Sequence, residues 1–72
     1  MKFWRATLDT RNFSFEAYGR RKSDAMMAMG EGMLVHQKQY KLPDDWATMD
    51  DVNFQEVELD RAYRDYEPLP RP

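Results

Sequence analysis

The stretch FWRATLDTRNFSFEAYG, residues 3–19, decides the fold that this sequence predicts. Apolar and polar side chains alternate before and after the quartet DTRN, which is typical of two half-buried strands joined by a short loop. Gly19 ends the second run. One face of this β-hairpin carries the apolar set Trp4, Ala6, Leu8, Phe13, Phe15 and Ala17. That face has to be covered by another element.

The opposite face of the predicted hairpin is more polar. It carries Phe3, Arg5, Thr7, Ser14, Glu16 and Tyr18. Antiparallel sheets tolerate one face in contact with water, so we expect this second face to be open.

A helix over residues 24–41 is expected to cover the apolar face. Ser23 is the candidate N-cap, and Pro43 limits the other end because it disfavours helical geometry at the residue before it. Spacings of three and four residues place one set of side chains toward the hairpin, namely Met26, Met29, Met33, His36 and Tyr40, flanked by Ala25, Gly30 and Gly32. We expect the two helical glycines to give clearance for the bulky hairpin side chains, while the methionines fill irregular gaps.

The remaining sequence predicts a polar connector and a third strand. In the connector PDDWATMDD, residues 43–51, Trp46 and Met49 are the expected anchors, and one short helical turn fits. The next run, VNFQEVELD, has strand composition, but its apolar positions change phase between Phe54 and Val57. Either a bulge or a strand that starts only near Gln55 would reconcile them.

The last segment, RAYRDYE, extends this strand or forms a short fourth one, and residues 68–72 form a polyproline-like tail. The predicted fold is a two-layer α+β domain over residues 1–67, in the order β-β-α-β. It has an antiparallel sheet of three to four strands, with one helix packed on one face.

Composition argues against an enzyme. The chain of 72 residues has no cysteine and one histidine, so no disulfide, thiolate metal site or catalytic triad is available. The sequence has no glycine-rich phosphate loop and no paired-histidine helix, and we expect His36 to pack at the edge of the core. The acidic connector lacks the spacing of a calcium loop. We therefore predict no catalytic residue, no metal and no cofactor.

The apolar runs are short. None reaches the length of a signal-peptide core or of a membrane span. We therefore expect a cytoplasmic protein without a membrane partner.

The charge distribution predicts two alternative binding surfaces. Residues 1–22 carry a formal charge of +4 and residues 23–72 a formal charge of −6. An acidic surface is suited to a partner that normally binds nucleic acid, and its predicted contact residues are Asp44, Asp45, Trp46, Asp50, Asp51, Glu56 and Glu58. The alternative is a nucleic-acid-binding face made of Arg5, Arg11, Tyr18, Arg20, Arg21 and Lys22. A structural homodimer joined through a strand edge or the helix is a third interpretation.

Three runs carry a resemblance to other proteins. TRNFSFEAYG (residues 10–19), EGMLVHQKQY (31–40) and AYRDYE (62–67) resemble small open reading frames of bacteriophages. FEAYGRRKSDAM (15–26) has a more distant likeness to the N-terminal domain of HicB-type antitoxins. The phage resemblance implies a protein that binds a host protein or nucleoprotein complex, as anti-CRISPR and other anti-defence inhibitors do. We therefore expect a non-enzymatic module that blocks a host defence complex through its acidic surface, in the host cytoplasm.

Overall fold

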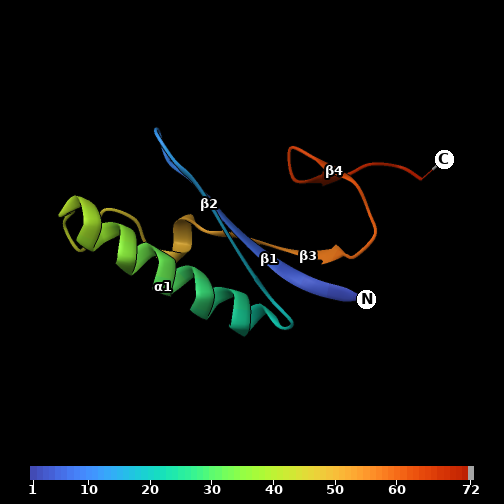
Figure 1. Cartoon of the computed structure of the whole chain (residues 1–72), viewed down its shortest axis with the longest axis horizontal. Helices are drawn as coiled ribbons and strands as arrows, with labels where there is room; N and C mark the ends of the chain where they lie inside the picture. The colour runs from blue at the N-terminus through green and yellow to red at the C-terminus, as the bar shows by residue number, and fades with distance from the viewer. Residues whose placement is uncertain (72) are drawn as a thin grey trace.

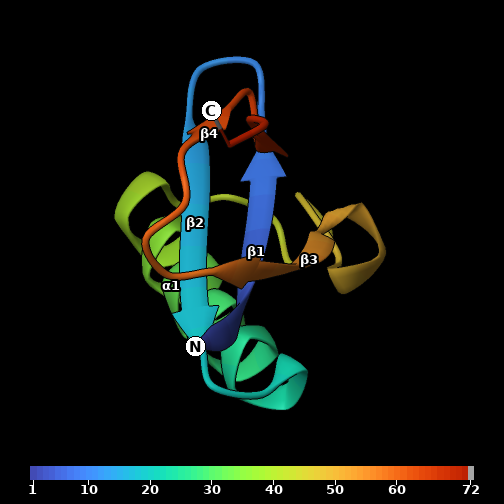
Figure 2. The same cartoon turned by 90° about the vertical axis from the view of Figure 1, so that its right-hand side faces the viewer.

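A computed structural model describes residues 1–71 and shows one helix packed on an antiparallel three-stranded sheet. The sheet has the strand order β2-β1-β3, and β4 and β5 form a separate two-stranded sheet (Figures 1 and 2). The elements are β1 (Lys2–Asp9), β2 (Ser14–Gly19), α1 (Lys22–Tyr40), the 3-10 helix η1 (Met49–Asp51), β3 (Asn53–Glu58), β4 (Tyr63–Arg64) and β5 (Glu67–Pro68). The predicted α+β class and the order β-β-α-β are confirmed, with three strands in the main sheet.

The core lies between α1 and the apolar face of the β1–β2 hairpin. Its buried side chains are Ala6, Leu8, Ala25, Met29, Met33 and Val52. Trp46 and Met49 of the connector pack against this core, as predicted, and η1 is the expected helical turn. The side-chain alternation of residues 3–19 therefore sets which face of the sheet α1 covers.

The N-terminus of α1 lies two residues before the predicted position, because Arg21 and not Ser23 is the N-cap. The Asp24 carboxylate accepts hydrogen bonds from the Arg21 backbone N–H at 3.3 Å and from Arg21 Nε at 3.1 Å. The side-chain hydrogen bond from Arg21 holds the pKa of Asp24 below its usual value. An acidic side chain reaching back to the N-cap stabilises a helix start in this way.

The first turn of α1 lies close against the end of β2 at Gly19. A Cβ atom on Gly19 would lie 2.4 Å from the backbone N of Ala25, so no larger residue fits without a backbone shift. A Cβ on Gly30 would meet only Met49 Cε, at 3.8 Å, and one on Gly32 would meet no heavy atom of residues 1–71 within 4 Å. The predicted clearance role of Gly30 and Gly32 is therefore wrong, because neither glycine points at the hairpin.

The third strand has no bulge. It pairs with β1 in one continuous antiparallel register over its whole length, so the predicted bulge and the predicted start near Gln55 are both wrong. Phe54 lies opposite Ala6 on the α1 side of the sheet, whereas Val57, only 1% exposed, lies opposite Phe3 on the other side. The change of phase in the sequence arises because both faces of β3 are covered.

The cover on the second face is the C-terminal hairpin of β4 and β5, which lies across the sheet from α1 (Figure 1). Arg5 is 7% exposed beneath it, with the guanidinium carbon 5.0 Å from the ring centroids of both Tyr63 and Tyr66. Arg5 Nη2 donates to Gln55 Oε1 at 2.6 Å and to the Tyr66 carbonyl at 3.0 Å. The prediction of an open face is therefore wrong around Arg5.

Part of the predicted tail, residues 68–72, belongs to this hairpin. Pro68 pairs with Tyr63 across β4 and β5, and Arg71 Nη2 lies 3.2 Å from Glu58 Oε2. The polyproline prediction is therefore wrong at Pro68. The last residue of the predicted tail, residue 72, lies outside the described residues. The segment RAYRDYE, instead of adding a fourth strand to the main sheet, supplies β4, the turn that follows it and the first residue of β5.

Candidate functional site: an aromatic groove

One wall of the site is the tip of the β1–β2 hairpin. Thr10 N–H donates to the Phe13 carbonyl at 2.8 Å, and the Thr10 hydroxyl accepts a hydrogen bond from Phe13 N–H at 3.1 Å. These bonds close a two-residue loop, so Arg11 and Asn12 stand at the tip. Phe13 follows directly, ahead of β2, and its side chain is 42% exposed.

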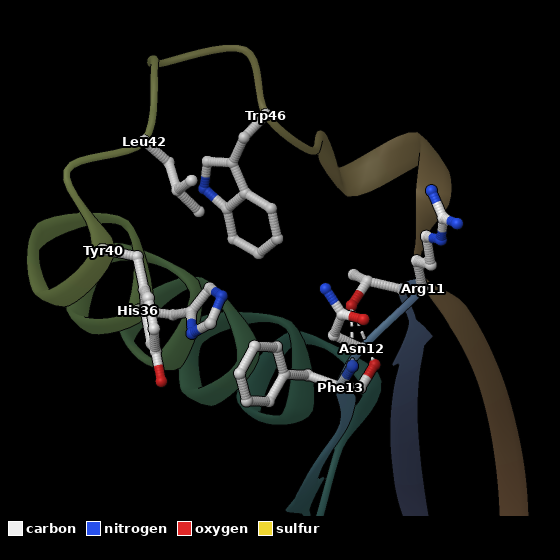
Figure 3. Close-up of a pocket in the computed structure, with 8 residues that line it drawn as sticks. Arg11, Asn12, Phe13, His36, Tyr40, Leu42 and Trp46 are labelled. Carbon is white, nitrogen blue, oxygen red and sulfur yellow. Dashed lines mark hydrogen bonds between the residues drawn. The ribbon is translucent and has the colours of Figure 1, made fainter.

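The second wall is the connector that follows α1. The helix ends at Tyr40, its C-cap Lys41 has a left-handed backbone with φ 53°, and Leu42 N–H donates to the Gln37 carbonyl at 2.9 Å. Pro43 cannot continue the helix, and its carbonyl accepts a hydrogen bond from Trp46 N–H at 3.2 Å. The chain thereby turns back and brings Trp46 over the end of α1 (Figure 3).

His36 is the centre of the aromatic cluster between these walls. Its ring centroid lies 4.9 Å from that of Phe13, 4.8 Å from Phe15, 4.7 Å from Tyr40 and 5.1 Å from Trp46. Such separations are favourable for aromatic contacts. His36 therefore packs among rings at the edge of the core, which agrees with the packing role predicted for it.

The space between the walls is a groove of about 510 Å³ that is open to solvent. It is lined by Thr10, Arg11, Asn12, Phe13, His36, Tyr40, Leu42 and Trp46, and we call it the aromatic groove. Figure 3 shows the Asn12 side chain and the Trp46 indole on opposite sides of it. Its volume falls within the roughly 300–1,000 Å³ of ligand pockets, and it combines an apolar lining with a few polar groups at the rim.

Two of the predicted acidic contact residues border this groove. Asp44 and Asp45 are exposed and directly precede Trp46, and Asp44 Oδ1 accepts a hydrogen bond from Gln37 Nε2 at 2.8 Å. Trp46 itself is half-buried. It therefore packs against the core and forms a wall of the groove.

The other predicted acidic contact residues lie further along the chain. Asp50 and Asp51 are in η1, and Glu56 and Glu58 are in β3. Most of them have partners within the chain: Asp51 Oδ2 with Thr48 N–H at 2.9 Å, Glu56 with Lys2 at 3.8 Å, and Glu58 with Arg61 at 3.9 Å and with Arg71 at 3.2 Å. The predicted acidic surface is thus divided, and only its connector part adjoins the groove.

The predicted nucleic-acid face is divided as well. Arg11 stands at the hairpin tip, whereas Arg20, Arg21 and Lys22 lie at the opposite end of β2. Lys22 Nζ is placed 5.2 Å from the ring centroid of Phe54. Arg5 is buried under the C-terminal hairpin, so it is not available to a phosphate group.

Tyr18 lies on the face of the sheet away from α1. Its ring is 5.8 Å from that of Phe3, and its hydroxyl donates to Glu16 Oε2 at 2.8 Å. Two effects raise the pKa of Tyr18: partial burial is the larger, and the hydrogen bond to Glu16 is the second.

Sequence reasoning did not identify Phe13, Tyr40 and Leu42 as site residues. The rings of the groove come from three separate segments, and each ring alone is typical of a core position. One feature of the sequence could have indicated Phe13 as a site residue. It directly follows the turn, and near the tip of a hairpin few neighbouring residues can cover a large ring.

The chain matches no protein-family model, no curated protein and no solved structure. Within residues 1–71, no helix combines the length and apolar character needed to cross a membrane. In the same part of the chain, no three His, Cys, Asp or Glu side chains gather closely enough to hold a metal ion.

Proposed function

We propose that this protein is a non-enzymatic protein-binding module whose aromatic groove takes an apolar side chain of a partner. The observation that carries the proposal is the exposure of two rings that line the groove, 42% for Phe13 and 55% for Tyr40. Aromatic side chains are enriched at protein interfaces and dominate their binding energy, because each buries a large area. The chain's single histidine is packed among rings, which supports binding over catalysis.

The two carboxylates beside the connector wall of the groove support a basic partner segment at that wall. No cationic side chain of residues 1–71 forms an ion pair with Asp44 or Asp45. Charges at the rim of an apolar contact steer association and select the partner. The proposed partner therefore presents an apolar or aromatic side chain flanked by lysine or arginine. The further proposal that this partner is a host defence complex, inhibited by occlusion, is supported by the phage resemblance alone.

Affinity capture from host lysate with quantitative mass spectrometry tests the proposal. Phe13→Ser and Tyr40→Ser should each reduce the captured partner at least tenfold, since truncating an interface hot spot costs about 2 kcal/mol or more. Leu34→Ser is the matched control, because Leu34 is also on α1 and 50% exposed but does not line the groove. Circular dichroism establishes that all three variants are folded. A partner retained by both groove variants, or lost equally with Leu34→Ser, would refute the role of the groove.

The acidic rim has its own variant. Asp44→Asn combined with Asp45→Asn should weaken capture less than the ring variants, and it should make capture less sensitive to salt. An unchanged salt dependence would exclude a basic partner segment at this rim.

A further inference from the structure

We infer that the outer edge of β2 pairs with a second copy of this chain, giving a symmetric dimer with one continuous six-stranded sheet. In the strand order β2-β1-β3, β2 is an edge strand, and no strand of residues 1–71 pairs with its outer side. Natural proteins protect such edges with lysine, proline or a bulge. The β2 sequence SFEAYG has none of these, and Glu16 is its one charged residue. This inference goes beyond the proposed function and does not depend on the aromatic groove.

The hairpin geometry shows which backbone groups of β2 are available. Thr10 N–H donates to the Phe13 carbonyl, and in an antiparallel ladder the pairs that exchange hydrogen bonds alternate with pairs that do not. Counting from the Thr10–Phe13 pair, Phe15 and Ala17 bond to β1. The N–H and C=O groups that point away from β1 are therefore those of Ser14, Glu16 and Tyr18.

Side-chain complementarity selects the register. With a twofold axis at Ala17, Glu16 lies opposite Tyr18 of the second copy, and Tyr18 already hydrogen-bonds Glu16 within the chain. An axis at Glu16 would instead place two carboxylates directly opposite each other, which is unfavourable.

The flank of α1 beside this edge fits the same partner. Ala28, Gly32 and Val35 share this flank through their four- and three-residue spacings, while Gly30 on the opposite flank faces Met49 of the connector that leads to β3. Val35 is 54% exposed, and a Cβ on Gly32 would meet no heavy atom of residues 1–71 within 4 Å. A glycine there costs the helix about 1 kcal/mol relative to alanine. No contact among the described residues explains this cost.

The position of α1 on the sheet brings this flank close to α1 of the second copy. Rings of His36 and Phe15 lie 4.8 Å apart and Leu8 is buried, so α1 packs over both β2 and β1. α1 lies more over β2 than over β1, toward the outer edge of the sheet, so the helices of two copies joined along β2 would lie close together. Packed helices are separated by about 8–10 Å, with small residues needed at the short end. Ala28 and Gly32 supply such residues.

Sedimentation equilibrium over a range of concentrations tests the dimer. The wild-type chain should show twice the mass of one chain. Glu16→Pro should weaken association at least tenfold, because the N–H it removes has no partner within the sheet. Glu56→Pro is the matched control, since it makes the same change at an outward-facing position of the other edge strand, β3, and it should leave the dimer intact. Gly32→Leu should weaken association to a similar degree while circular dichroism shows an intact helix.

A cysteine variant tests the register directly. Two Ala17 residues facing each other across the axis would form a non-hydrogen-bonded pair with Cα atoms about 4.5 Å apart, within disulfide range. The chain has no cysteine, so Ala17→Cys should yield an intermolecular disulfide on mild oxidation and Glu56→Cys should not.

Three outcomes would overturn the inference. They are a monomeric wild type up to about 1 mM, a dimer that Glu16→Pro and Gly32→Leu leave unchanged, and an Ala17→Cys chain that does not cross-link. If Glu16→Pro does not fold, the Ala17→Cys cross-link and the mass of Gly32→Leu decide whether the dimer forms through this edge. Tyr40→Ser should reduce capture at least tenfold and leave the mass of the dimer unchanged, so a failed dimer and a failed groove are distinguishable.

Discussion

At the scale of single residues, Gly19 determines how closely α1 lies against the sheet. A side chain there would overlap the backbone of Ala25 and the Cβ of Asp24, at 2.4 and 2.6 Å. Because these atoms belong to the helix itself, they cannot move without shifting its first turn. Gly19→Ala should therefore lower the free energy of unfolding by about 1–3 kcal/mol, the usual cost of overpacking. Urea denaturation at a fixed protein concentration measures this.

Gly30→Ala is the control for that substitution. Its added methyl group would make only an ordinary contact with Met49 Cε at 3.8 Å, so the better helix propensity of alanine should raise stability by up to about 1 kcal/mol. Equal losses at Gly19 and Gly30 would mean that both glycines have the clearance role that the structure assigns to Gly19.

At the scale of elements, the start of α1 depends on pH through Asp24. The hydrogen bond from Arg21 lowers the pKa of Asp24 below 3.8 in the folded protein. A carboxyl group with a lowered folded pKa contributes stability above its unfolded pKa, and this contribution is lost as the pH falls through the folded pKa. Asp24→Ala should therefore be less stable than wild type at neutral pH, and this difference should shrink below about pH 4. Thermal unfolding followed by circular dichroism from neutral to acidic pH measures the change.

The control for this pH profile is Asp45→Ala, which removes a carboxylate from the connector without touching a helix start. Its difference from wild type should stay nearly flat over the same range. A flat profile for Asp24→Ala as well would show that the Arg21–Asp24 pair does not stabilise the helix.

The elements also show how far the sequence predicts this structure. Alternation predicted β1 and β2 because, in both strands, a period of two places most of the apolar side chains on the face that α1 covers. The same reasoning failed at β3, where Phe54 and Val57 lie on opposite faces of the sheet and both faces are covered. The sequence pattern did not predict that β4 and β5 would pack on the second face. The helix start was misplaced because an Arg21–Asp24 pair replaced the expected serine cap.

For the groove, the sequence predicted the packing roles of several residues but not that they come together around one groove. His36 and Tyr40 were expected on the packing side of the helix, and Trp46 was expected as an anchor. Their assembly with Phe13 depends on the left-handed residue Lys41, which reverses the chain and which no composition pattern specifies. Tertiary geometry of this kind is set by the whole chain and is not readable from any one segment.

At the scale of the whole molecule, Arg5 joins the C-terminal hairpin to the sheet. No carboxylate of residues 1–71 forms an ion pair with it, and its buried Nε has no hydrogen-bond partner there. The charge is instead held between Tyr63 and Tyr66, and cation–π contacts gain strength when they are shielded from water. Tyr66 has φ 68°, an uncommon conformation for a bulky residue. This conformation keeps both its ring and its carbonyl against Arg5.

Arg5→Lys should loosen the C-terminal hairpin while α1 stays protected. Lysine keeps the charge but lacks the planar fork that stacks between two rings and donates to Gln55. We expect amide hydrogen exchange in residues 63–67 to rise at least tenfold, which corresponds to about 1.4 kcal/mol of local stability. Arg64→Lys, at an exposed position of β4, is the control and should leave exchange unchanged. Equal exchange in the two variants would show that Arg5 does not hold the hairpin, and the hydrogen bond from Glu58 N–H to the Tyr63 hydroxyl, at 2.8 Å, would remain as a link to the sheet.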